Sequence, residues 1–146
     1  MDSKEFKALF ADIAKLNDFQ KAFGGWYKES SECIVVIDLQ KSNFGDYYEM
    51  NIKIYIQGMF GQNYSISKDL VKKDIGDVFR RQPQEYNSVF DFDKPIDDRM
   101  RHDNLKRLFS EFIVPFTNKA LSMSGIKELA TKEEIFLLPV VKEKLG

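Results

Sequence analysis

Apolar residues near the start of the chain recur at steps of three and four, a spacing that places them on one side of a helix. Asp2 and Ser3 precede this pattern, and both residue types accept hydrogen bonds from the free N–H groups of a helix start. The pattern therefore predicts an N-terminal helix with one apolar face. The residues of this face are Phe6, Leu9, Phe10, Ile13 and Leu16.

After Gly24-Gly25 the pattern shortens to a period of about two, which is typical of strands. The β-branched segment Cys33–Gln40 and the alternating segment Tyr47–Gln57 flank Asn43–Asp46, whose composition is typical of a turn. If this hairpin pairs Ser42 with Tyr47, one of its faces is wholly apolar. The predicted pairs on that face are Leu39 with Met50, Ile37 with Ile52, Val35 with Ile54 and Cys33 with Ile56.

A third strand is predicted on the N-terminal side of this hairpin. Joining Glu29 to Glu32 by a tight turn sets Trp26 opposite Val35, on the same apolar face. The sequence therefore predicts a three-stranded antiparallel meander that runs from Trp26 to Gln57.

The pattern is less regular after the meander. Residues 59–70 are compatible with a short strand or an exposed turn, because two glycines interrupt a polar alternation. Residues 72–83 indicate connecting structure with a short amphipathic piece, and residues 88–92 indicate a further strand.

The last third of the chain predicts helices. Apolar residues recur at helical steps from Ile96 to Leu121, and Pro115 is expected to kink this helix or to end it. Ser124-Gly125 predicts a stop, and residues 131–134 resemble the capping box of a further helix. We expect this closing helix to be broken or restarted at Pro139.

The apolar face of the meander must be covered. The N-terminal helix and the long helix, with its stripe of Phe109, Phe112 and Phe116, are the elements able to cover it. We therefore predict an α+β fold: an antiparallel sheet with a meander core, covered on one face by the N-terminal and long C-terminal helices. No repeat or linker divides the chain, so we expect residues 1–146 to form a single globular domain.

Composition and charge argue against several classes of function. The 22 Lys and Arg residues against 23 Asp and Glu residues give a net charge of −1, and nucleic-acid binding relies on excess positive charge. The single cysteine, Cys33, cannot close an intramolecular disulfide, and the single histidine, His102, provides no zinc ligand set. No apolar run has the length of a membrane span. We therefore expect a cytoplasmic protein without metal, cofactor, nucleic-acid or membrane partner.

The opposite face of the meander carries the residues that we expect to bind a partner. By the same register this face mixes amide, charged and aromatic side chains, which lose little entropy on binding because a rigid sheet holds them. An ordinary solvated sheet face is the alternative interpretation. The candidate binding residues on this mixed face and at its rim are Tyr27, Gln40, Lys41, Ser42, Asn51, Lys53 and Tyr55.

His102 and the acids before it suggest two further chemistries. A carboxylate such as Asp98 can orient an imidazole for acid–base catalysis, and Asp97 with Asp98 could bind a divalent cation. No motif ties a serine or cysteine nucleophile to His102, and acids at a helix start also stabilise its dipole. A structural role is therefore the favoured interpretation of all three residues.

One segment resembles a known family. Gln40, Lys41 and Ser42 end a hydrophobic strand, and Asn51 lies in the strand that follows. With these residues the segment Phe19–Gln57 resembles the bacterial domain of unknown function family 4304. The resemblance implies a small, single-domain bacterial protein and brings no assigned activity.

These observations lead to one expected function and one alternative. We expect a non-catalytic domain that binds another macromolecule, a protein, through the mixed face or the Gln40–Ser42 corner; an immunity-type partner of a toxin is one such protein, by analogy alone. The alternative is a small-molecule-binding protein or an enzyme. Its pocket would lie between the sheet and the 96–122 helix, with Gln40, Lys41, Asn51 and His102 as polar groups.

Overall fold

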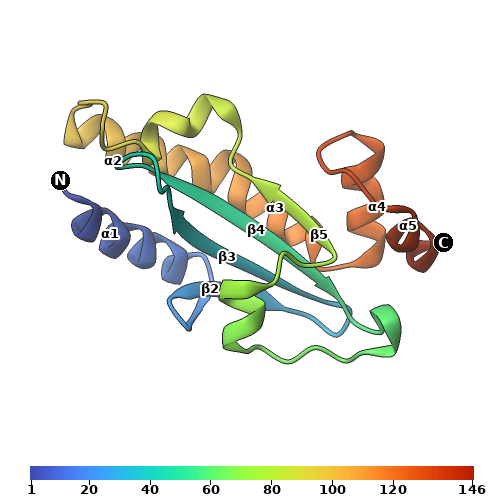
Figure 1. Ribbon diagram of the computed structural model, residues 1–146. Coiled ribbons are helices and arrows are strands. Elements are labelled where there is room, and N and C mark those ends of the chain that lie inside the picture. The colour runs from blue at the N-terminus through green and yellow to red at the C-terminus, as the bar shows by residue number, and fades with distance from the viewer.

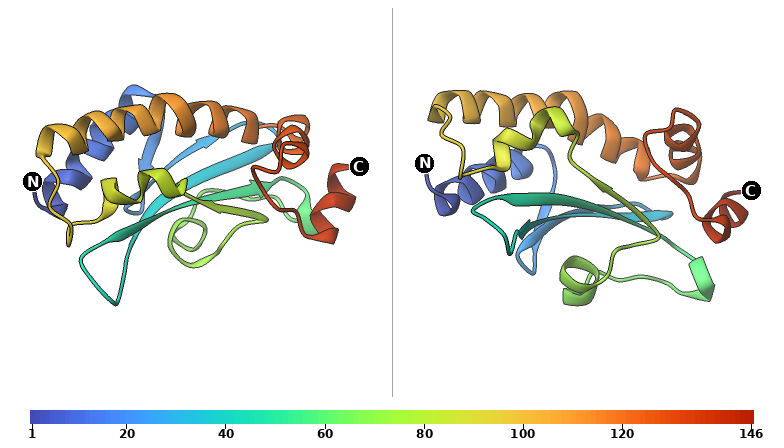
Figure 2. Two further views of the ribbon diagram at one scale, coloured as in Figure 1. Left: turned by 90° about the horizontal axis from the view of Figure 1, so that it is seen from above. Right: turned by 45° about the horizontal axis from the view of Figure 1, so that its top comes forward.

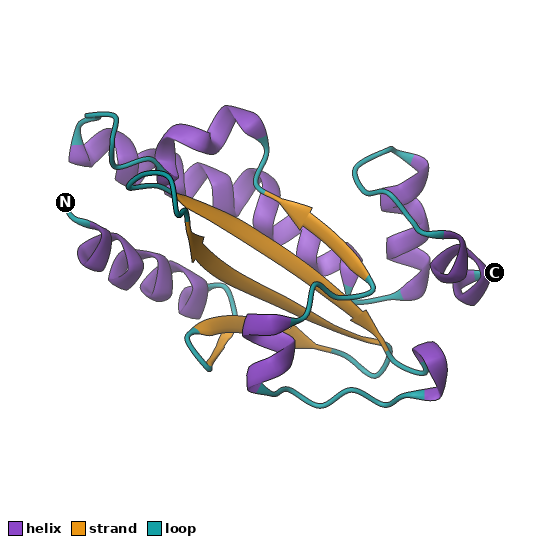
Figure 3. Cartoon of the chain, viewed as in Figure 1, coloured by secondary structure: helices purple, strands orange, loops and turns teal.

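The computed structural model, which describes residues 1–146, contains a five-stranded antiparallel sheet (Figures 1 and 3). Its strands lie in chain order, so each pairs with the next strand of the sequence. With helices packed on this sheet, the predicted α+β class is confirmed. The strands are β1 (Gln20–Ala22), β2 (Gly25–Glu29), β3 (Cys33–Lys41), β4 (Tyr48–Ile56) and β5 (Val78–Arg81).

The predicted register of β3 with β4 is confirmed, from Leu39 opposite Met50 to Cys33 opposite Ile56. The predicted register of β2 with β3 is wrong, because Trp26 lies opposite Ile37. The turn explains the difference: the Ser30 N–H donates to the Cys33 carbonyl at 2.8 Å, which makes Ser31 and Glu32 the tip of the hairpin. Trp26 still points into the core and is 4% exposed, because a shift of two residues keeps a side chain on the same face.

Two short strands, β1 and β5, were not predicted. The strand predicted at residues 88–92 is wrong, since the 3-10 helix η3 (Gln84–Phe90) occupies most of this range and only an isolated bridge joins Asp91 to Tyr47. Residues 59–70 contain the short helix η1 (Met59–Gly61), followed by η2 (Asp69–Lys73), a single π-helical turn.

The N-terminal and long helices cover the apolar face of the sheet, as predicted (Figure 2). Helix α1 (Ser3–Leu16) begins where the Asp2 carboxylate accepts the Glu5 N–H. The long helix comprises α2 (Asp98–Leu108), a π-helical turn η4 (Phe109–Ile113) and α3 (Val114–Ala120). The chain stays helical through Pro115 because the wider turn just before it changes the hydrogen-bonding pattern that the proline would otherwise break.

Two short helices follow, α4 (Met123–Thr131) and α5 (Pro139–Leu145). The predicted stop at Ser124-Gly125 is wrong: Ser122 caps α4, and Gly125 lies inside it, where a Cβ would overlap the Lys119 carbonyl oxygen. The capping box predicted at residues 131–134 is also wrong, because α4 ends there. The predicted restart at Pro139 is correct.

The main core lies between the helices and the sheet. It contains 31 buried residues drawn from every part of the chain, from Phe6 to Val141. Aromatic rings dominate its centre: Phe10 lies 4.7 Å from Trp26 and 5.0 Å from Phe109 between ring centroids. No helix is both long enough and apolar enough to span a bilayer.

Candidate functional site

The mixed face of the sheet is largely covered by residues 62–77, which we call the covering segment. In Figure 2 its helical turn η2 lies on the side of the sheet opposite the long helix. Leu70 and Val71 from this turn pack on the mixed face and form a second, smaller core. The sheet residues of this core are Ile34, Val36 and Tyr55.

Two of the predicted binding residues hold the covering segment in place. The Tyr55 hydroxyl donates to the Leu70 carbonyl at 2.6 Å, and the Lys53 ammonium donates to the Val71 carbonyl at 2.7 Å. Burial raises the pKa of Tyr55 and lowers the pKa of Lys53, since both charged forms lose solvation. Most of Tyr55 and the stem of Lys53 are therefore closed to a partner.

The covering segment leaves a cavity of about 400 Å³ at one end of the mixed face, which we call the sheet pocket. Three of the predicted residues, Gln40, Asn51 and Lys53, line it. The exposed apolar residues Ile75 and Phe79 lie at its rim. Its other lining residues are Asp38, Leu39, Lys72, Lys73, Asp74 and Arg81.

Asp38 is the buried charge of this pocket and is 5% exposed. Its Oδ1 lies 3.7 Å from the Lys53 ammonium and its Oδ2 lies 3.9 Å from the Lys72 ammonium, both beyond hydrogen-bond distance. Oδ1 accepts no hydrogen bond within the chain. Asp38 therefore has cations nearby but a free acceptor oxygen.

A chain of hydrogen bonds crosses the pocket from β5 to β3. The Arg81 Nε donates to the Asn51 Oδ1 at 3.3 Å, and the Asn51 Nδ2 donates to the Gln40 Oε1 at 2.9 Å. The amide of Asn51 is thus fixed from both sides, and it is 4% exposed. The Arg81 terminal amino groups and the Gln40 amino group make no further hydrogen bond in the chain and stay available as donors.

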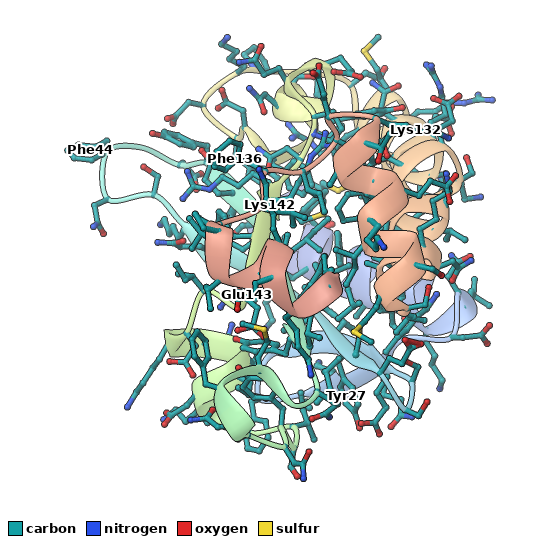
Figure 4. All side chains as sticks on the ribbon, turned by 90° about the vertical axis from the view of Figure 1, so that its right-hand side faces the viewer. Tyr27, Phe44, Lys132, Phe136, Lys142 and Glu143 are labelled. Atoms are coloured by element: carbon teal, nitrogen blue, oxygen red, sulfur yellow. The ribbon has the colours of Figure 1, made fainter.

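The remaining predicted residues lie elsewhere. Lys41 and Ser42 are at the end of β3, beside the hairpin tip where Phe44 is 93% exposed and projects away from the molecule (Figure 4). The Tyr27 hydroxyl donates to the Gln20 side chain at 2.9 Å on the β1–β2 edge. The structure therefore brings Gln40, Asn51 and Lys53 together, while Lys41 and Ser42 flank this group. Tyr27 packs against the second core on the same face, outside the sheet pocket.

A second hollow, of about 670 Å³, lies along the outer edge of β5, and we call it the edge groove. One side is formed by Phe79–Gln82 and the other by Glu133–Leu137, with Lys142 at one end. Figure 4 shows Phe136 and Lys142 on the side of the molecule where α5 lies. The Arg80 guanidinium donates to the Glu134 carbonyl at 2.5 Å and so joins the two sides.

A protein-family model matches residues 10–119 of the chain; its description is "Domain of unknown function (DUF4304)". The chain belongs to the DUF4304 family. No curated protein and no solved structure matches this chain. Every residue that lines the sheet pocket lies inside the range matched to DUF4304, whereas the Glu133–Leu137 side of the edge groove lies outside it.

Sequence reasoning did not include Asp38, Lys72 and Arg81 among the binding residues of this DUF4304 chain. Asp38 carried a signal, because it is the one charged residue within the apolar run Cys33–Leu39 and the register set it opposite Asn51. Arg81 carried a weak one as a basic residue close in the chain to Lys72, but neighbouring acids offset this charge and its strand was interpreted as connecting structure. Lys72 reaches the pocket only through the fold of the covering segment.

The structure separates His102 from the other polar groups of the alternative pocket. His102 is on α2, which packs on the apolar face, whereas Gln40 and Asn51 are on the mixed face. The His102 Nδ1 lies 3.4 Å from the exposed Asp103 carboxylate, and its only hydrogen-bond partner is that residue. Asp97 caps α2 by accepting the Arg99 N–H at 2.7 Å, so its structural role is confirmed.

Proposed function

We propose that this DUF4304 protein is a non-catalytic binding module that takes an extended segment of a partner protein as an additional strand beside β5. The observation that carries the proposal is the free edge of β5, which opens onto the edge groove. A strand edge presents unpaired N–H and C=O groups, and extended peptides bind such edges through main-chain hydrogen bonds.

The register identifies the backbone groups that face the groove. Along β4, the N–H groups of Met50 and Ile56 point toward the β5 side, where they donate to the side chains of Gln82 and Asp77. The alternation of an antiparallel pair then directs Val78 and Arg80 of β5 toward β4. The N–H groups of Phe79 and Arg81 are directed away from the sheet.

The far wall of the groove supports a partner with apolar residues at alternate positions. Successive side chains of an added strand point to opposite sides, so every second one would face the Glu133–Leu137 wall. This wall is apolar at its centre, with Ile135, Phe136 and Leu137. Phe136 is 83% exposed, and a partner side chain packed on it would remove this apolar surface from water.

The proposal extends to the biological setting. An immunity protein, which blocks a toxin by binding it, has no need of catalytic groups, and this class is part of the proposal by analogy alone. We place the protein in a bacterial cytoplasm, where a reducing environment suits its single, fully buried Cys33.

A matched pair of variants at Phe79 tests strand addition. Phe79→Pro removes the outward N–H and leaves the hydrogen bonds to β4 in place, whereas Phe79→Thr removes the same aromatic ring and keeps the N–H. The probes are peptides of about ten residues, selected from a random displayed library on the full-length wild-type chain. We expect the selected peptides to lose at least about tenfold in affinity for Phe79→Pro and to change less than about threefold for Phe79→Thr.

A second readout locates the bound peptide. Amide hydrogen exchange of the wild-type chain is measured by NMR with and without a selected peptide, and the amides of Phe79 and Arg81 are expected to become protected. Equal binding to the proline and threonine variants, or unchanged exchange at these two amides, would refute strand addition. Thermal melts of both variants confirm that the comparison is made on folded protein.

A further inference from the structure

The sheet pocket contains an acceptor that the chain itself does not satisfy. Asp38 is only 5% exposed, and neither oxygen of its carboxylate accepts a hydrogen bond from the chain. The nearest cation, the Lys53 ammonium, is 3.7 Å away and directs a proton to the Val71 carbonyl at 2.7 Å instead. A buried acceptor without a donor is unfavourable, so this wall of the pocket favours a ligand that brings a hydrogen-bond donor.

Other side chains of the pocket have hydrogen-bond donors that the chain itself does not fully use. The Arg81 guanidinium is held through its Nε, which leaves its terminal amino groups free to form the paired hydrogen bonds that suit a carboxylate. The Lys72 ammonium has only long contacts, 3.3 Å to the Gly24 carbonyl and 3.9 Å to Asp38. The Gln40 amino group is also free.

The charge balance of the lining adds to this pattern. The lining contains four basic residues, Lys53, Lys72, Lys73 and Arg81, and two acids, Asp38 and Asp74. Asp69, which lies 3.5 Å from the Lys73 ammonium, offsets one of the basic groups, so an excess of positive charge remains. An anionic ligand would neutralise this excess. A donor on the same ligand would satisfy Asp38.

We infer that the sheet pocket binds a small carboxylic acid that carries an amino or hydroxyl group, in other words an amino acid or a hydroxy acid. Its carboxylate contacts the Arg81 guanidinium and the Gln40 amide, and its amino or hydroxyl group donates to the Asp38 carboxylate through Oδ2, the oxygen on the Lys72 side. Ile75, which is 68% exposed, and Phe79 provide apolar contact for the rest of the molecule. The cavity of about 400 Å³ lies within the range usual for small-molecule sites, about 300 to 1,000 Å³.

The probes that test this inference form matched triplets. Each triplet contains an L-amino acid, the 2-hydroxy acid with the same side chain, and the unsubstituted carboxylic acid, as in L-aspartate, L-malate and succinate. A triplet is tested for every standard amino acid whose hydroxy and unsubstituted analogues exist. Thermal shift with the full-length chain at millimolar probe finds the binders, and calorimetry gives their affinities.

We expect at least one amino or hydroxy acid to bind at least about tenfold more tightly than its unsubstituted analogue, because only the substituted acid brings the donor for Asp38. Asp38→Asn should reduce this preference to less than about threefold for an amino acid, since the neutral amide no longer attracts the ammonium. Arg81→Met should weaken binding of every member of the triplet by at least about tenfold.

Controls keep the result interpretable. Arg81 and Arg107 are both exposed, and Arg107 lies on α2 across the sheet, so Arg107→Met is the matched variant and should bind normally. If Asp38→Asn fails to fold, the Arg81→Met comparison and the preference of the wild-type chain within each triplet still test the inference. No binding by any amino or hydroxy acid, equal affinity within the triplets, or unchanged affinity in Arg81→Met would each overturn the inference. Strand addition uses the backbone of Phe79, so its failure would leave these outcomes unchanged.

Discussion

At the scale of single residues, Asp77 shows how a charge is placed where the covering segment joins β5. Its carboxylate accepts the Ile56 N–H at 2.8 Å and the Tyr64 hydroxyl at 3.1 Å. Burial nevertheless raises the pKa of Asp77, because desolvation outweighs the two hydrogen bonds that favour the charged form. The folded chain therefore binds this proton more readily than the unfolded chain does.

The pH dependence of stability follows from this shift. A carboxyl group whose pKa is raised by folding favours the folded state at low pH, and that contribution is lost as the pH rises from the unfolded pKa through the folded pKa. A neutral amide at this position does not titrate, so it does not lose stability as the pH rises. We therefore expect the free energy of unfolding of Asp77→Asn, relative to wild type, to increase between pH 4 and pH 7.

Urea unfolding at both pH values measures this difference. The amide can still accept the Ile56 N–H through its oxygen and donate to the Tyr64 hydroxyl through its nitrogen, so the packing is kept. Asp12→Asn, on the exposed side of α1, is the control and should show no comparable trend. A relative stability of Asp77→Asn that stays constant or falls with pH would contradict the assignment.

At the scale of elements, the pairing of β3 with β4 could be predicted because it depends on alternation alone. Ile52 and Ile54 face the main core, and a shift of one residue would turn both to the opposite, mixed face. Strand β5 could not be found in this way, because Arg80 occupies a core-facing position and interrupts the alternation. Its guanidinium stacks on Phe112, 4.6 Å from the ring centroid, so a basic residue serves where the pattern requires an apolar one.

For the candidate site, too, the sequence predicted what depends on strand alternation and missed the rest. Register alone placed Gln40, Asn51 and Lys53 on one face, and they do line one pocket. The covering segment, by contrast, packs through Leu70 and Val71, which are neighbours in the chain and fit neither a strand nor a helix period. For that reason the sequence could not show that this segment closes most of the face.

The attachment of the covering segment can be tested on its own. Tyr55→Phe removes the hydroxyl that donates to the Leu70 carbonyl at 2.6 Å and leaves that buried carbonyl without this donor. We expect a loss of about 1 kcal/mol in the free energy of unfolding, together with faster amide exchange in η2. Chemical denaturation and hydrogen exchange measure the two effects.

Tyr27→Phe is the matched control, because it removes a hydroxyl from the same face. That hydroxyl bonds to the exposed Gln20 side chain, so the change should be close to zero. Equal effects of the two variants would show that Tyr55 does not anchor the covering segment.

At the scale of the whole molecule, the main core connects both ends of the chain. Phe6 of α1 and Val141 of α5 belong to the same cluster of 31 buried residues. An element whose buried face is shared with the rest of the core loses its packing when the core opens. We propose, on this basis, that residues 1–146 unfold as one domain.

Coincident transitions would support the proposal of one domain. Trp26, the single tryptophan, lies in the core and reports on the sheet by fluorescence, while far-UV circular dichroism reports chiefly on the helices. We expect the two urea curves to superimpose, with the same midpoint and slope. An earlier loss of helical signal would show that the C-terminal helices unfold separately.

The order of the strands also has a consequence for how the chain folds. The entropic cost of closing a loop grows with its length. Short turns join β2 to β3 and β3 to β4, whereas residues 57–77 separate β4 from β5. The three central strands will therefore pair early in folding, and β5 will dock late. Until it does, the β4 edge beside Ile52 and Ile54 is open, and the newly made chain is most exposed to aggregation at the edge that β5 later protects.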